Sequence, residues 1–187
     1  MQFSKTLLAV CLLPVFACVY PVTSTGSAGA GRASAAVAAA GAEPRATGSA
    51  YGATEARIFD LINAERRHQG LRPLVFNAQL NQMARIQAQN MAYYQKMAHV
   101  LPNASLPTLG DRAHYVGYPF MRLAENVALG YPNAETVVEG WMNSRGHRLN
   151  ILDAGVVETG IAIARSVTGG LYYCQVFGRQ MVVGGTL

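Results

Sequence analysis

The sequence predicts an α+β fold in which helices come first and strands come last. Residues 54–69 and 77–98 carry apolar side chains at helical spacing, whereas residues 160–166 and 171–177 have the pattern of a β-hairpin with two glycines near its turn. A run of helical patterns followed by a run of strand patterns is typical of an α+β domain. With 187 residues the chain has room for one domain of ordinary size.

Residues 1–30 are typical of a secretory signal. Lys5 precedes an uncharged run over residues 6–20, which is short for a membrane span but suits the apolar core of a signal peptide. Two processing outcomes are compatible with this sequence: cleavage after the small residues 28–30, which gives a soluble product, or lipid attachment at Cys18. We therefore predict a secreted or periplasmic protein, with soluble export favoured over a lipid anchor.

Residues 31–53 are rich in Ala, Gly and Ser and lack apolar periodicity. Such a segment cannot bury enough apolar surface to offset the entropy of ordering, so a linker is predicted here. The folded domain is expected to span residues 54–180, with a C-terminal tail at residues 181–187.

The charge and the cysteine content limit which kinds of partner and covalent bond the domain can have. The net charge of +5 falls to +3 from Thr54 onward, where twelve Lys and Arg face nine Asp and Glu. This weak and scattered excess does not predict a nucleic-acid partner. Outside the signal region Cys174 is the only cysteine, so the domain cannot form an internal disulfide. Its strand-like surroundings favour a buried apolar thiol over a reactive one.

The two N-terminal helices have recognisable end signals. Thr54 is a candidate N-cap for the first helix, and Gly70 stands just past its end. Asn77 can cap the second helix, in which Met83 and Met91 recur at helical spacing. Core packing explains these methionines better than a ligand role.

An irregular region over residues 100–121 follows, with at most a short helix at residues 111–116. Irregular segments of this length are often functional. Residues 123–129 then alternate enough to predict a short strand. Because Glu125 in this strand has apolar neighbours, we expect a partner for its carboxylate.

Asn133 is predicted to cap a further helix, in which Trp141 packs inward. This helix is expected to end at residues 144–145, with Gly146 as a left-handed terminator. His147 follows directly, so its titratable imidazole can point into a cleft.

Five ordered motifs over roughly residues 54–179 together resemble the bacterial branch of the CAP superfamily, which groups cysteine-rich secretory proteins, insect venom allergens and plant pathogenesis-related proteins. The motifs are Ile58-Phe59-Asp60-Leu61-Ile62-Asn63-Ala64-Glu65-Arg66, then His99, then Ala124-Glu125-Asn126-Val127-Ala128, then residues 141–152, and last Tyr173-Cys174-Gln175-Val176-Phe177-Gly178. The resemblance implies a CAP/SCP-like three-layer α-β-α sandwich, with helices on both sides of a small, mostly antiparallel sheet.

The resemblance also implies a central cleft that in several family members holds a divalent ion. His99, Glu125 and His147 match the two histidines and one acid of this cleft, and a His/Glu set with positions left to water suits zinc. Two departures stand out: Ala124 replaces the family's usual glycine, and Ser144 replaces a second acid, as is common in the bacterial branch. His114 lies in the irregular region and is expected to be exposed.

Three functions are compatible with these residues. The first is a binding module whose cleft takes a divalent ion and a surface ligand without turnover. The second is lipid or sterol carriage, which a preponderance of exposed apolar side chains at residues 100–121 would favour. The third is hydrolysis, with His147 as base and either Ser144 as nucleophile or a metal-bound water as attacking group.

We rank these functions in the order binding, lipid carriage and hydrolysis. Ser144 and His147 are the candidate catalytic residues, and neither is assigned. The expected partner is a small ligand or a lipid, and we expect a monomer without a transmembrane segment in the mature domain.

Overall fold

The computed structural model describes residues 52–181. The predicted signal peptide, nearly all of the predicted linker and nearly all of the C-terminal tail lie outside these residues. In the described part no helix combines the length and the apolar character needed to cross a membrane.

The described residues form helices and strands in a mixed order. The helices are α1 (Gly52–His68), α2 (Ala78–Tyr94), α3 (Leu109–Tyr115), α4 (Ala134–Asn143) and α5 (Arg145–Ile151). The strands are β1 (Val75–Phe76), β2 (Phe120–Leu129), β3 (Glu158–Arg165) and β4 (Leu171–Gln180).

The strands form one sheet in the order β1-β3-β4-β2, so β2 is an edge strand. β4 pairs antiparallel with both β2 and β3, whereas the two-residue β1 pairs parallel with β3. The predicted small, mostly antiparallel sheet is confirmed. The predicted hairpin is also confirmed, and Gly169 in its turn has a φ of 91°.

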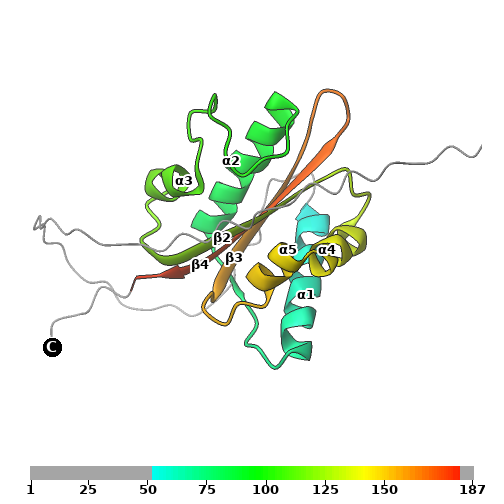
Figure 1. The fold of residues 1–187 in the computed structure, drawn as a ribbon, viewed down its shortest axis with the longest axis vertical. Helices are drawn as coiled ribbons and strands as arrows, with labels where there is room; N and C mark the ends of the chain where they lie inside the picture. The colour runs from blue at the N-terminus through cyan, green and yellow to red at the C-terminus, as the bar shows by residue number, and fades with distance from the viewer. Residues whose placement is uncertain (1–51, 182–187) are drawn as a thin grey trace, which may run out of the picture.

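Helices cover both faces of the sheet, which confirms the three-layer α-β-α sandwich (Figure 1). One core lies between the sheet and the side of α2 and α3, and it contains Met83 and Met91. The other core lies on the side of α1, α4 and α5, and it contains Trp141. The predicted packing roles of both methionines and of the tryptophan are therefore confirmed.

Several helix ends follow local sequence signals. The side chain of Asn77 accepts hydrogen bonds from the backbone N–H groups of Gln79 and Leu80, at 2.9 and 3.1 Å, and so caps α2. Asn133 caps α4 by accepting from the N–H of Thr136 at 2.9 Å. Gly70 follows α1 with a φ of 68°, a conformation that glycine adopts at low cost.

Other helix ends differ from the prediction. Thr54 is not the N-cap of α1, because the helix already begins at Gly52. α2 ends at Tyr94 rather than near residue 98, because Gln95 takes a left-handed conformation with a φ of 49°. α3 begins two residues before the expected position, where the side chain of Thr108 accepts from the N–H of Asp111 in a capping box.

The largest correction concerns Gly146. It is not a left-handed terminator: Ser144, with φ −91° and ψ 120°, interrupts the helix, and Gly146 lies inside the following helix α5. Ser144 is thus both the C-cap position of α4 and the N-cap position of α5. His147 lies in the first turn of α5 rather than in a loop.

Close packing of α2 against the sheet depends on Gly160 of β3. A Cβ atom at this position would overlap the backbone of Leu80 and Asn81. The missing side chain therefore lets the first turn of α2 approach the strand directly.

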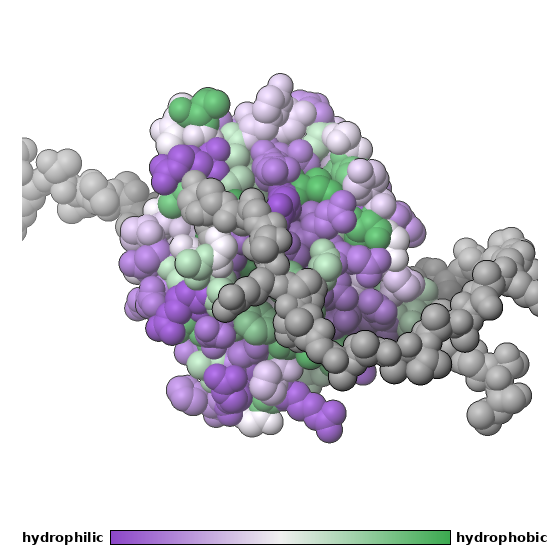
Figure 2. Space-filling model, turned by 180° about the vertical axis from the view of Figure 1, so that it is seen from behind, coloured by the Kyte–Doolittle hydropathy of each residue, from purple (hydrophilic) through white to green (hydrophobic). Residues whose placement is uncertain are grey.

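The face of the molecule seen from behind is mixed, with hydrophobic residues in small groups among hydrophilic ones (Figure 2).

Candidate functional site

The candidate site is built around Glu125 on the edge strand β2. Alternation along this strand directs Leu123 and Val127 into the core beside α2, and Ala124 and Ala128 into the core on the opposite face. Glu125 shares the face of Leu123 and Val127, and its side chain is only 3% exposed. A carboxylate at this depth requires partners.

Glu125 has a partner at each carboxylate oxygen. Oε1 lies 2.9 Å from Nδ1 of His99, in the segment after α2. Oε2 accepts a hydrogen bond from Nη2 of Arg112, on α3, at 2.5 Å. The guanidinium of Arg112 is fully buried, so the acid and the cation form a buried ion pair. Glu125 therefore has the partner that the sequence led us to expect, and it has two of them, His99 and Arg112.

Gln87 of α2 links the cation back to the histidine segment. Its Oε1 accepts from Nη1 of Arg112 at 2.6 Å, and its Nε2 donates to the carbonyl oxygen of Ala98 at 2.5 Å. The contacts from Gln87 through Arg112 and Glu125 to His99 therefore close a ring of polar groups. Such a ring holds the imidazole of His99 in one orientation.

His147 approaches from the other face of the sheet. Asn126, the neighbour of Glu125 on β2, donates from Nδ2 to the carbonyl oxygen of His147 at 3.2 Å. Asn150 of α5 donates from Nδ2 to Oδ1 of Asn126 at 2.9 Å. These contacts fix the start of α5 against the exposed edge of β2, and the side chain of His147 is buried there.

The surroundings of His147 lower the pKa of its imidazole. Burial, and then the charge of His99, lower the pKa of His147 to about 4. His147 is therefore neutral at physiological pH, and one of its two ring nitrogens carries a lone pair that can accept a hydrogen bond or bind a metal.

Both histidines present an unpartnered nitrogen in the buried part of the site. Nε2 of His99 and Nε2 of His147 are buried and have no hydrogen-bond partner. For His99 the carboxylate at Nδ1 favours the tautomer with a proton on Nδ1, which leaves the lone pair on Nε2. Two buried imidazole nitrogens without partners are the outstanding chemical feature of this site.

The structure thus brings His99, Glu125 and His147 into one region across the edge of β2. Within residues 52–181 no three or more His, Cys, Asp or Glu side chains are arranged as a metal cluster. The oxygens of Glu125 are both engaged, whereas the Nε2 atoms of the histidines are free. The two Nε2 atoms are thus the part of this set that is open to a ligand, and Glu125 orients His99.

Ser144 does not have the contact that a nucleophile would need. No hydrogen bond within residues 52–181 joins Ser144 Oγ to His147, and Ser144 makes no side-chain capping bond to α5. The pairing of these two candidate catalytic residues stays a prediction.

The irregular region at residues 100–121 does not show the pattern that would favour lipid carriage. Leu101, Leu109 and Tyr118 are buried in the core beside α2, and the exposed large hydrophobic residues in this range are Val100, Tyr115 and Met121. His114 is exposed, as expected, with its ring 6.3 Å from that of Phe120.

Cys174 is a buried thiol, as the sequence predicts. Its Sγ lies 3.5 Å from Oε2 of Glu125, opposite the strand position of Val127. Burial raises the pKa of this thiol well above its usual value. A protonated thiol donates to the carboxylate and adds to the stabilisation of Glu125.

Sequence reasoning missed Arg112 and Gln87. Neither residue lies in a motif. Gln87 is an ordinary polar residue of a predicted helix, and Arg112 lies in a region predicted to be largely irregular, so nothing in the sequence marked either one as part of the site. One available signal was the expectation that Glu125 has a partner, which points to one of the nearby basic residues. The sequence does not show which arginine is buried, because that depends on how α3 packs.

Comparison with known proteins places these features in a wider context. The chain is 34% identical over 131 residues to the uncharacterized protein YkwD of Bacillus subtilis, with 70% of this chain and 49% of that protein covered. It is 30% identical over 124 residues to the uncharacterized membrane protein YlbC of the same organism, with 66% and 34% covered. The chain thus spans about half and about a third of the length of these relatives.

Solved structures share the fold. An extracellular protein containing an SCP domain from Bacillus anthracis superposes with a TM-score of 0.63 at 29% identity, over 68% of this chain and 41% of that one. An outer surface protein from Borrelia burgdorferi superposes with a TM-score of 0.64 at 19% identity, over 70% and 96%. The second likeness concerns the fold alone.

The family assignment follows from the match to a family model. The model of CAP, the cysteine-rich secretory protein family, matches residues 59–177, which include α3, the edge strand β2 and both histidines of the site. This protein therefore belongs to the CAP family.

Proposed function

We propose that this CAP-domain protein is an exported binding module that holds a divalent cation between His99 and His147, with zinc as the preferred ion. The observation that carries the proposal is the pair of buried, unpartnered Nε2 atoms. A buried polar atom without a partner is costly, and a ligand that accepts both lone pairs would remove that cost.

The donor chemistry supports zinc over the harder cations. Neutral imidazole is a good ligand for zinc, whereas calcium and magnesium prefer oxygen. The low pKa of His147, about 4, keeps its imidazole neutral and ready to bind at neutral pH. Two protein ligands leave further positions to water or to a bound ligand, and the chemistry that zinc supplies when bound is that of a Lewis acid.

Glu125 has an orienting role in this proposal. A carboxylate at Nδ1 of a metal-binding histidine fixes the ring orientation and raises the basicity of the other nitrogen. Arg112 neutralises the second oxygen of the same carboxylate, so Glu125 contributes orientation rather than uncompensated negative charge to the site. The proposal thereby refines the three-ligand expectation to two ligands and one supporting acid.

Export is part of the proposal. It rests on the signal-like sequence at residues 1–30 and on a structural relative at 29% identity that is described as extracellular. Soluble release and lipid attachment at Cys18 are distinguished by the mass of the mature protein.

The test is a calorimetric titration of zinc into the full chain and its variants. We expect His99→Ala and His147→Ala each to weaken zinc binding by more than the ~10–100-fold typical of losing an outer-shell partner. His114→Ala is the matched control, because His114 is exposed on α3, and it should bind as the wild type does.

Equal zinc uptake by the wild type and both site variants would contradict the proposal. Thermal unfolding of each variant without metal checks that the loss reflects the site and not the fold.

A further inference from the structure

Three segments that are distant in sequence meet at one end of the molecule. The last turn of α2 and the β3–β4 turn extend to the same end (Figure 1). They are in direct contact, because Thr168 Oγ1 donates to Gln95 Oε1 at 2.8 Å. The end of β2 joins them where the N–H of Gly130 donates to the carbonyl of Leu171 at 2.9 Å.

Apolar side chains at this end are unusually exposed. Val167 in the β3–β4 turn is 95% exposed and Tyr93 is 80% exposed, the two highest values among the large hydrophobic residues of the described part. We define the end surface as Tyr93, Tyr94, Lys96, Met97, Leu129 and Val167. Isolated exposed hydrophobic residues are ordinary, but several from three segments gathered at one end indicate an interaction surface.

The charge of the end surface is positive. Lys96 is exposed, and the sequence around each of the three segments lacks acidic residues: none occurs at residues 66–110, 126–134 or 159–187. A lysine beside tyrosine and aliphatic side chains can contact lipid phosphates while the apolar groups enter the interface of a bilayer.

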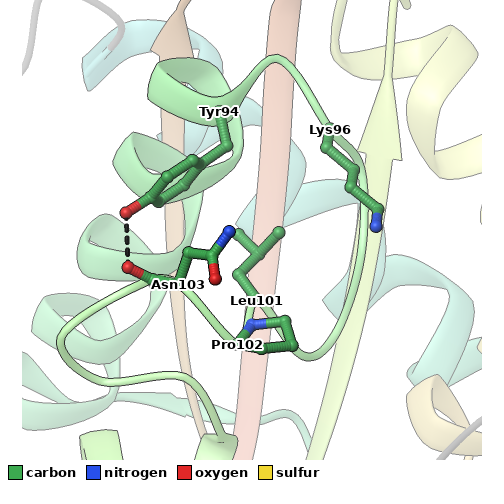
Figure 3. A pocket seen from close by; sticks show the side chains of 5 residues that line it. All are labelled: Tyr94, Lys96, Leu101, Pro102 and Asn103. Atoms are coloured by element: carbon green, nitrogen blue, oxygen red, sulfur yellow. Dashed lines mark hydrogen bonds between the residues drawn. The ribbon is translucent and has the colours of Figure 1, made fainter.

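A pocket of about 200 Å³ opens beside this surface. Its lining is Tyr94, Lys96, Leu101, Pro102 and Asn103, and the hydroxyl of Tyr94 donates to the carbonyl of Asn103 at 2.6 Å (Figure 3). The hydroxyl of Tyr94 and the ammonium of Lys96 lie on opposite sides of the pocket (Figure 3). The ammonium is thus available to an anionic group that enters from solvent.

We propose that the end surface docks on an anionic phospholipid bilayer. Val167, Tyr93 and Met97 enter the interfacial region, and Lys96 contacts lipid phosphates. The shape supports a bilayer over a protein partner, because the most exposed residues lie on a protruding turn and on a helix end rather than in a groove. This interaction goes beyond the proposed cation site and does not depend on it.

The experiment is co-sedimentation of the full chain with vesicles. One set contains equal parts of phosphatidylethanolamine and phosphatidylglycerol, and the other contains phosphatidylcholine alone. We expect stronger binding to the anionic vesicles. Because residues 6–20 are apolar and can bind any bilayer, each comparison is made between variants of the same full-length chain.

Substitutions separate the apolar and the charged contributions. We expect Tyr93→Ser combined with Val167→Ser to weaken binding to anionic vesicles about tenfold, since two apolar side chains leave the interface. Lys96→Gln should weaken it about fivefold, the value of one lysine near an anionic surface. Tyr115→Ser combined with Met121→Ser is the matched control, because these exposed residues lie elsewhere, and it should leave binding unchanged.

The proposal is overturned if the Tyr93/Val167 variant binds anionic vesicles as the control does, or if Lys96→Gln binds them as the wild type does. Self-association through the same residues in the absence of vesicles would also overturn it, because the end surface would then be a protein interface.

Discussion

The carboxylate of Glu125 lies between a cation and an imidazole, and this arrangement determines what each neighbour can do. Arg112 supplies charge compensation at one oxygen, and His99 supplies a hydrogen bond at the other. The imidazole is thereby oriented with Nε2 directed away from the acid. One buried ion pair thus fixes the orientation of this imidazole.

This ion pair leads to a prediction about stability. Glu125→Gln leaves the guanidinium of Arg112 buried without its counter-charge, and we expect the free energy of unfolding to fall by about 3–5 kcal/mol. Chemical denaturation measures this loss. The matched control is Glu135→Gln, which breaks an exposed pair with Arg57 and should leave stability close to that of the wild type.

A double variant tests the cause. If the unpaired cation is responsible, Arg112→Met combined with Glu125→Gln should recover part of the loss. If the double variant is no more stable than Glu125→Gln alone, the loss of stability comes from the packing of the new Gln side chain and not from the unpaired cation.

His147 leads to a prediction about pH. Its pKa is about 4 in the folded protein and 6.5 in an unfolded chain, so between these values the unfolded state binds a proton that the folded state does not. Stability without metal should therefore fall as the pH drops from 6.5 towards 4, by about 3 kcal/mol from this residue, and be unaffected by it well above pH 6.5.

Urea denaturation of the wild type and of His147→Gln across this pH range measures the effect. The difference in stability between the two proteins should shrink or change in favour of the variant as the pH falls. A constant difference across the range would show that burial of His147 does not depress its pKa.

At the scale of elements, Arg66 connects α1 to the chain between α5 and β3. This arginine is 2% exposed, and its guanidinium donates to the carbonyl oxygens of Ile151 at 2.7 Å and Asp153 at 2.9 Å. It also donates to the carbonyl of Arg72 at 2.9 Å. Its main role is to satisfy buried carbonyl groups.

We expect Arg66→Met to lower the free energy of unfolding by about 3 kcal/mol, because it leaves these buried acceptors without donors. Arg67→Met is the matched control, since Arg67 is the exposed neighbour on the same helix and should change stability by less than about 0.5 kcal/mol. Both values come from denaturant titration. Equal effects of the two substitutions would show that the hydrogen bonds from Arg66 to these carbonyl groups do not stabilise the fold.

Element prediction succeeded where signals are local. Asn77 and Asn133 were predicted as caps because a short polar side chain can satisfy the first N–H groups of its own helix. Prediction failed for β1, because two residues carry no period and pair with a strand more than eighty positions away. It failed for α5 because Gly146 has the residue type of a helix terminator, while the break occurs two residues earlier at Ser144.

At the scale of the whole molecule, the site exists because β2 is an edge strand. His99 reaches it from the layer of α2 and α3, and His147 from the layer of α1, α4 and α5. A central strand would be flanked on both sides, and the two histidines could not approach each other around it. The order of strands therefore matters as much as the identity of the three residues.

The sequence by itself determined the family, the three-layer fold, the caps Asn77 and Asn133, and the three candidate residues His99, Glu125 and His147. These follow from motifs and from neighbours within a few positions. Only the tertiary structure decided that Arg112 and Gln87 complete the site, that both oxygens of Glu125 are engaged, and that two Nε2 atoms are left without partners. The physical reason is that burial and hydrogen bonding between layers depend on packing, and packing brings together residues that no local pattern connects.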